Sequence, residues 1–154
     1  MKTRILAVWM TICCAAALLA GCGDAQAADA GKVADELKTS LVFQDDMMEI
    51  EKDVLENYYR VTDEEIEDFK VYKSASGATA EEIAVFTAKS GKTEAVKNAV
   101  EMRVEDLGLS FEDYVPEEMV KINNAVIVTR GSTVALVVAD DSDGAKSLLD
   151  DLLK

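Results

Sequence analysis

The stretch that decides the fold is AVIVTRGSTVALVVA, residues 125–139. Two runs of β-branched and aliphatic residues, 125–130 and 133–139, flank the dipeptide Gly131-Ser132. A two-residue connection with glycine first is typical of a tight β-hairpin, because glycine readily adopts the backbone angles that this turn requires. The stretch therefore predicts two antiparallel strands.

A second hairpin is expected upstream, from 69–73 to 82–88. The first of these segments alternates in polarity, and the second, EIAVFTA, is rich in residues that favour strands. The connecting segment, 74–79, consists of small residues with Gly77 among them, which is typical of a turn. Together the two hairpins predict a sheet of four antiparallel strands.

Apolar residues that recur every three or four positions predict helices around these hairpins. A capping box from Thr62 to Glu65 predicts a further short helical turn that includes Ile66. We therefore expect an α+β fold, a four-stranded antiparallel sheet with packed helices in the order α-α-β-β-α-β-β-α. The expected helices are 32–41, 47–60, 93–107, 117–122 and one that begins at 140–143.

Both faces of the central strands are apolar. Alternate residues of 133–139 and of 83–86 point to opposite faces of a sheet, and both sets are aliphatic or aromatic. We expect helices to cover both faces, with the alternative that one face meets a partner. In the helix 93–107, Arg103 is expected at the edge of the apolar side.

The composition excludes several classes of protein. The chain has 154 residues, a formal net charge of −14 and no histidine. An acidic chain lacks the basic surface that nucleic-acid binding requires, so no nucleic-acid partner is expected. Without histidine, the usual serine and cysteine triads and histidine metal sites are excluded. Hydrophobic residues make up 49% of the chain, which is typical of a globular domain.

The N-terminus has the pattern of a secretory signal. Lys2 and Arg4 precede the segment 5–19, which is apolar apart from Thr11. This segment is shorter than the ~20 residues of a membrane-spanning helix, so a transmembrane segment is the second choice. The sequence LAGC that follows, residues 19–22, resembles the lipobox of bacterial lipoproteins.

The lipobox resemblance implies cleavage between Gly21 and Cys22 and diacylglyceryl modification of the Cys22 thiol, with acyl chains such as palmitate. The alternative is an ordinary signal peptide with an incidental cysteine. Cleavage removes Lys2 and Arg4, which lowers the net charge from −14 to −16, and leaves one cysteine. The expected organisation is a signal peptide over 1–21, a lipidated cysteine and flexible tether over 22–31, and a single α+β domain over 32–154.

The stretch from Val54 to the C-terminus resembles a catalogued family. The matching segments begin AEEIAVF at 80–86 and continue with AVKNAVEMR at 95–103 and YVPEE at 114–118. The last is VIVTRG at 126–131. In this combination the chain is similar to domain of unknown function 4358, found in small lipoproteins of Gram-positive bacteria. The resemblance implies the α+β fold and a location on the outer face of the cytoplasmic membrane, and it implies no activity.

Two acidic clusters are candidates for metal binding or catalysis. Three aspartates precede Gly144, but a calcium loop aligned on this glycine lacks its first acidic ligand, so we expect a helix cap and no metal. The second cluster has no aromatic platform beside it, which favours a solvated surface over a glycosidase pair. The residues of the two clusters are Asp140, Asp141 and Asp143, and Asp45, Asp46, Glu49 and Glu51.

Two further groups of side chains are candidates. Ser74, Ser76 and Thr79 lie in the small-residue segment without the glycines of a nucleophile elbow, so a turn is expected there. The adjacent Tyr58 and Tyr59 are a possible contact for a partner. The more common arrangement places one tyrosine in the core and the other at its rim.

These observations leave several functions open. The first is a lipid-anchored extracytoplasmic protein that binds another protein or an envelope component without catalysis. The alternatives are a carboxylate-dependent hydrolase of the cell envelope and an accessory component of a transport system. No cofactor is expected. The expected partners are the membrane, through the diacylglyceryl anchor, and an extracytoplasmic protein.

Overall fold

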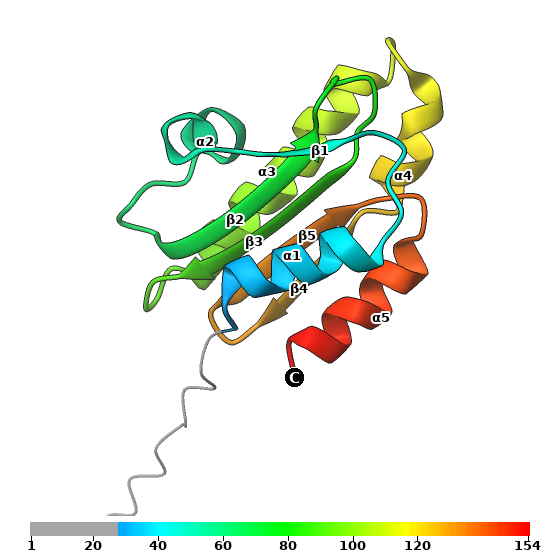
Figure 1. The fold of residues 1–154 in the computed structure, drawn as a ribbon. Coiled ribbons are helices and arrows are strands. Elements are labelled where there is room, and N and C mark those ends of the chain that lie inside the picture. The colour runs from blue at the N-terminus through cyan, green and yellow to red at the C-terminus, as the bar shows by residue number, and fades with distance from the viewer. Residues whose placement is uncertain (1–27) are drawn as a thin grey trace, which may run out of the picture.

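The computed structural model describes residues 28–154 (Figure 1). Gly21 and Cys22, the expected processing and lipidation site, lie outside the described residues. The chain folds into one sheet with helices on both of its faces. In chain order the elements are α1 (Ala30–Ser40), β1 (Met47–Glu49), α2 (Lys52–Tyr59), β2 (Ile66–Ser74), β3 (Glu82–Ala88), α3 (Thr93–Phe111), a 3₁₀ turn η1 (Pro116–Glu118), α4 (Met119–Asn123), β4 (Val126–Arg130), β5 (Thr133–Val138) and α5 (Ser142–Leu152).

The sheet contains both predicted hairpins. Its strand order is β1-β2-β3-β5-β4, and every neighbouring pair is antiparallel. Arg130 faces Thr133 across the two-residue turn, where Gly131 has a positive φ of 57°. The central pair β3–β5 joins the two hairpins into one sheet.

The sheet has five strands where four were expected. The additional strand, β1, pairs with the end of β2, so that Met47 faces Ser74. This segment was expected to open a helix over 47–60, but the helix begins only at Lys52. The backbone of 47–49 pairs with β2 and the Met47 side chain is buried, which is a tertiary effect that overrides the loose helical spacing.

The turn before β2 also differs from expectation. The backbone N–H of Thr62 donates to the Glu65 carboxylate, as in a capping box, but only a turn forms. Ile66, expected in a helical turn, instead begins β2 and is buried. Pairing with β3 therefore takes up the residue that would have continued the helix.

Helices cover both faces of the sheet, as the alternating apolar residues predicted. α1 and α5 pack on one face, over a core that includes Ile83, Val85 and Val137 (Figure 1). The long helix α3, with α2 and α4, covers the other face over Phe86, Val134 and neighbouring residues. No helix among residues 28–154 combines the length and apolar character needed to cross a membrane.

Two helices extend beyond their predicted ends. α1 begins at Ala30, two residues before the expected start, because the Asp29 side chain accepts a hydrogen bond from the backbone of Lys32 and caps the helix. α3 continues to Phe111, four residues beyond the expected end at residue 107. The buried Phe111 ring packs into the core and holds this last turn in place.

Candidate functional site

The most unusual chemistry in the interior is a pair of adjacent glutamates at the start of β3. Glu81 is only 1% exposed and Glu82 only 2% exposed. A buried carboxylate is stable only when it is paired and hydrogen-bonded. The two side chains satisfy this requirement with different partners.

Glu82 is bound by α3 and α2 together. Arg103 donates from Nε to Oε1 over 2.9 Å and from Nη2 to Oε2 over 2.6 Å, and the Tyr59 hydroxyl donates to Oε1. Arg103 is 9% exposed, so it lies inside the core and not at the edge of the apolar side of its helix as predicted. Burial opposes its charge, but the Glu82 carboxylate raises the pKa of Arg103 overall. Burial, and then the charge of Glu82, raise the pKa of Tyr59 well above its ordinary value, so the hydroxyl remains a donor.

Glu81 is bound by the loop before β1 and by α4. It accepts hydrogen bonds from the backbone N–H groups of Gln44 and Asp45, and it forms an ion pair with Lys121 at 3.2 Å. Lys121 also pairs with Glu118 at 3.2 Å. Burial opposes the charge of Lys121, but hydrogen bonds to Glu118 and Glu81 raise its pKa. This network fixes the corner where α4 meets β3.

Both buried carboxylates are therefore fully engaged. Every oxygen of Glu81 and Glu82 accepts at least one hydrogen bond from the protein. A carboxylate that acts as a general acid or base must reach the proton it transfers in the substrate. In this geometry both glutamates stabilise the fold by joining the elements around the start of β3.

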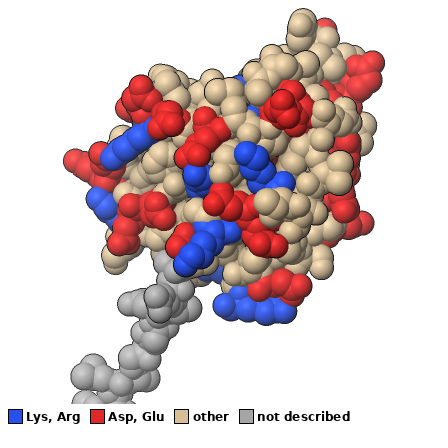
Figure 2. Space-filling view, viewed as in Figure 1, with Lys and Arg blue, Asp and Glu red and all other residues tan. Residues whose placement is uncertain are grey.

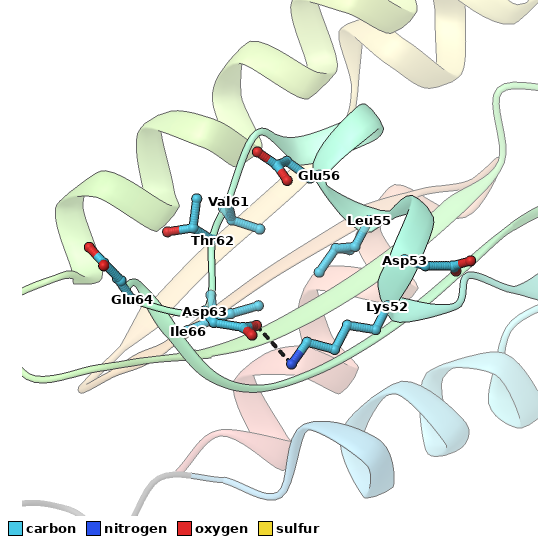
Figure 3. A pocket seen from close by; sticks show the side chains of 9 residues that line it. All are labelled: Lys52, Asp53, Leu55, Glu56, Val61, Thr62, Asp63, Glu64 and Ile66. Atoms are coloured by element: carbon cyan, nitrogen blue, oxygen red, sulfur yellow. Dashed lines mark ion pairs between the residues drawn. The ribbon is translucent and has the colours of Figure 1, made fainter.

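A hollow lies between α2 and the loop that leads into β2 (Figure 3). Its volume is about 790 Å³, and Leu55, Val61 and Ile66 form an apolar floor. Lys52 pairs across it with Asp63 at 2.8 Å. The remaining charged side chains of its rim are acidic: Asp53, Glu56 and Glu64.

A second hollow of about 320 Å³ continues the first. The two share Lys52, Asp63 and Ile66, and the second extends along the beginning of β2 to Phe69 and Lys89. It adds two more acidic residues, Glu67 and Asp68. We call the two hollows together the acidic groove.

The acidic groove runs beside a free strand edge. β1 pairs only with 72–74, and beyond it the Val71 carbonyl accepts from the backbone N–H of Ile50. Alternate residues of a strand direct their peptide groups to the same side. Phe69 lies two residues before Val71, so its N–H and C=O groups also point to this edge of β2. Within residues 28–154 no strand pairs with this part of β2 on that side. The groove thus combines an apolar floor, an acidic rim and available backbone groups.

The two candidate tyrosines lie at the end of α2, beside the groove. Tyr59 is 1% exposed and packs edge-to-face against Phe86, with ring centroids 4.9 Å apart. Tyr58 is half-buried, and its ring lies 5.1 Å from the Arg103 guanidinium and 5.6 Å from Lys73 Nζ. Of the two, only Tyr58 reaches the surface in this conformation.

The remaining candidates have structural roles. Asp141 caps α5 by accepting from the backbone N–H of Gly144 over 2.9 Å, which confirms the predicted helix cap. Among residues 28–154 no group of three or more acidic, histidine or cysteine side chains is arranged to hold a metal ion.

The acidic cluster at 45–51 and the small-residue loop at 74–79 meet at Asp45. Asp45 accepts hydrogen bonds from Ser74 and Ser76, which lower the pKa of its carboxyl. Glu49 instead pairs with Lys70 at 2.6 Å. The structure therefore divides this cluster between two sets of partners.

Sequence reasoning missed the most deeply buried charges. Two signals were present: a Glu-Glu pair at the start of a strand that is otherwise apolar except for Thr87, and Arg103 among apolar positions of a helix. Each is an unfavourable place for a charge unless a partner lies opposite.

The fold and the site together define this protein as an α+β domain with an acidic groove. The model of the family described as Domain of unknown function (DUF4358) matches residues 39–139, and the chain belongs to this family. The match includes the acidic groove and both buried networks. No curated protein and no solved structure matches the chain.

Proposed function

We propose that the protein is a lipid-anchored extracytoplasmic binding module, and that the acidic groove holds a segment of another extracytoplasmic protein. The observation that carries this proposal is the groove itself, in which an apolar floor and an acidic rim lie beside a free strand edge. Such edges bind extended peptides through main-chain hydrogen bonds, while adjacent pockets select the side chains.

The chemistry of the groove defines the partner. The rim and its extension carry six acidic residues against Lys52 and Lys89. A complementary segment has basic residues that meet the rim and aliphatic residues that reach Leu55, Val61 and Ile66. Charge complementarity speeds the encounter, and burial of the apolar residues supplies affinity.

The apolar floor provides selectivity that charge alone does not. Acidic residues outnumber basic ones by 30 to 16 in the chain, and acidic side chains are spread over the face seen in Figure 2. A basic peptide is therefore attracted to much of the surface. Only a segment that also has apolar residues at the right spacing can use the groove.

The anchor proposal rests on the LAGC sequence at 19–22. Diacylglyceryl modification of Cys22 would hold the domain at the outer face of the cytoplasmic membrane. Two acyl chains bury enough CH₂ groups, at ~0.8 kcal/mol each, for stable attachment. The domain would then meet partners within reach of its tether.

A peptide titration tests the groove. The probe is an extended peptide of alternating lysine and valine, and the control replaces lysine with glutamate. We expect NMR shifts with the lysine peptide that are concentrated in α2 and residues 61–69, and none with the glutamate peptide. Equal shifts over the whole surface, or no saturation, would contradict the proposal.

A matched pair of variants separates the groove from general charge. Glu56→Lys with Glu64→Lys reverses two exposed rim residues. Glu112→Lys with Glu117→Lys makes the same change at exposed residues that line neither hollow. We expect the first pair to abolish saturable binding and the second to weaken it only slightly.

A further inference from the structure

A separate small pocket, of about 200 Å³, lies between the end of α2, the turn before β3 and the last turns of α3. It shares no lining residue with the acidic groove. Its wall combines aromatic and aliphatic side chains with two cations and two acidic residues, whereas six acidic residues line the groove. The side chains that matter here are Tyr58, Lys73, Arg103, Leu107, Ser110 and Phe111.

The Arg103 guanidinium has unused hydrogen-bonding capacity toward this pocket. Its Nε and Nη2 donate to Glu82, but no group among residues 28–154 accepts from Nη1. Nη1 is not among the fully enclosed polar atoms that lack a partner, so it retains accessible surface. Arg103 lines this pocket and neither hollow of the acidic groove.

Lys73 supplies a second positive charge in the wall. Its Nζ donates to the Ser74 carbonyl over 3.3 Å, and its other two N–H groups have no acceptor among residues 28–154. The acidic residues of the wall, Glu81 and Glu82, are already occupied by Lys121 and Arg103. Lys73 pairs with no carboxylate among residues 28–154, so it is the cation of this wall without an acidic partner.

The pocket nevertheless suits only one negative charge. Asp45 lies nearby, bound to the Ser74 hydroxyl over 2.5 Å, and the whole chain is strongly acidic. Both repel a second negative charge. The volume is below the ~300–1,000 Å³ of pockets for drug-sized ligands, so the ligand must also be compact.

We propose that this pocket binds a small organic monocarboxylate with an apolar body. Its carboxylate accepts hydrogen bonds from Arg103 Nη1 and Lys73 Nζ, which are charge-assisted and therefore strong. Its body packs between Tyr58, Leu107 and Phe111. The proposal is independent of the acidic groove, since the two sites use different residues.

The experiment is a calorimetric titration of the purified full chain with benzoate, and with benzamide as a neutral control of the same shape. We expect saturable binding of benzoate and none of benzamide. Lys73→Gln removes the second cation, and we expect it to weaken the binding of benzoate about tenfold, or ~1.4 kcal/mol. Equal binding of both compounds, or no saturable benzoate binding, would overturn the proposal.

A second pair of variants locates the ligand without disturbing the buried ion pair. Ser110 is exposed on α3 at the pocket, so Ser110→Trp closes it with a large side chain and Ser110→Ala leaves it open. We expect the first variant to abolish benzoate binding and the second to retain it, with unchanged circular dichroism for both. Unaltered binding to a folded Ser110→Trp protein would place the ligand elsewhere. Inorganic phosphate that binds as tightly as benzoate would contradict the preference for a monocarboxylate.

Discussion

Arg103 and Glu82 join α3 to β3 through two parallel hydrogen bonds of 2.9 and 2.6 Å inside the domain. The Tyr59 hydroxyl adds a third contact from α2 to the same carboxylate. The Glu82 carboxylate thereby fixes α3, β3 and α2 to one another. Arg103 and Glu82 line the small pocket, and α2 contributes residues to both this pocket and the acidic groove.

Loss of the Arg103 side chain should strongly destabilise the fold. Arg103→Met leaves the Glu82 charge buried without its cation, which costs about 3–5 kcal/mol. Urea unfolding followed by circular dichroism measures this loss. Arg103→Met combined with Glu82→Gln removes both charges, and we expect it to recover part of the stability. If the single variant is as stable as the parent, the ion pair does not have the role assigned to it.

Tyr59 and Tyr58 should respond differently to substitution. Tyr59→Phe removes a hydrogen bond to a buried charged group, a loss of about 1.5–3 kcal/mol. Tyr58→Phe keeps the half-buried ring and removes a hydroxyl for which the structure gives no hydrogen bond among residues 28–154, so we expect little change. Equilibrium unfolding of both variants makes the comparison, and equal losses would contradict the division into core and rim.

Alkaline pH should destabilise the protein in part through Tyr59. Its pKa in the fold is raised well above the ordinary value of 10.0, so above that pH the unfolded chain releases a proton that the folded chain retains. The contribution of Tyr59 is complete below the unfolded pKa and falls as the pH rises past it. We expect Tyr59→Phe to reduce the fall in unfolding free energy between about pH 9 and about pH 11. An identical pH dependence in both proteins would contradict the assignment.

The aspartates before α5 should act as a cap and not as a calcium site. Asp141→Ala removes the hydrogen bond to the backbone N–H of Gly144, and we expect a loss of about 1 kcal/mol. Calorimetry at matched ionic strength should give the same loss in calcium and in magnesium. A calcium-specific stabilisation that disappears in Asp143→Ala would overturn this interpretation.

The lipid anchor should depend on Cys22 alone. Cys22→Ala removes the thiol that would accept the diacylglyceryl group, so we expect the protein in the medium or as uncleaved precursor. Cell fractionation with a high-salt wash makes the measurement. A Cys22→Ala protein that is processed and remains membrane-bound would contradict the lipoprotein proposal.

The hairpins could be predicted because their signals are local. Strand alternation and the glycine of the turn at 131–132 lie within a few residues of the pairs they form. β1 could not be predicted, because its three residues become a strand only by pairing with residues 72–74. Its helical spacing is weak, and tertiary pairing decides the outcome.

The buried charges could not be predicted for a related reason. Glu82 is separated from Arg103 by 21 residues, and Glu81 from Lys121 by 40. From the sequence, Arg103 is expected at the edge of the apolar side of its helix, and no partner is predicted for any of these charges. Only the packing of α3 and α4 against β3 brings the partners together. The acidic groove likewise joins α2 to the start of β2, where the sequence predicts a separate helical turn at Ile66 and a strand only from residue 69.

Site-specific photo-crosslinking in intact cells tests the central claim most directly. A photoreactive residue replaces Glu56 or Glu64 on the rim of the acidic groove, or Glu112 as the exposed control. We expect the rim positions to form a discrete adduct with one extracytoplasmic protein, and Glu112 to form none. Asp53→Lys, on the same rim, should remove the adduct. No adduct from either rim position, or the same adduct from Glu112, would contradict the account of the groove as a protein-binding site.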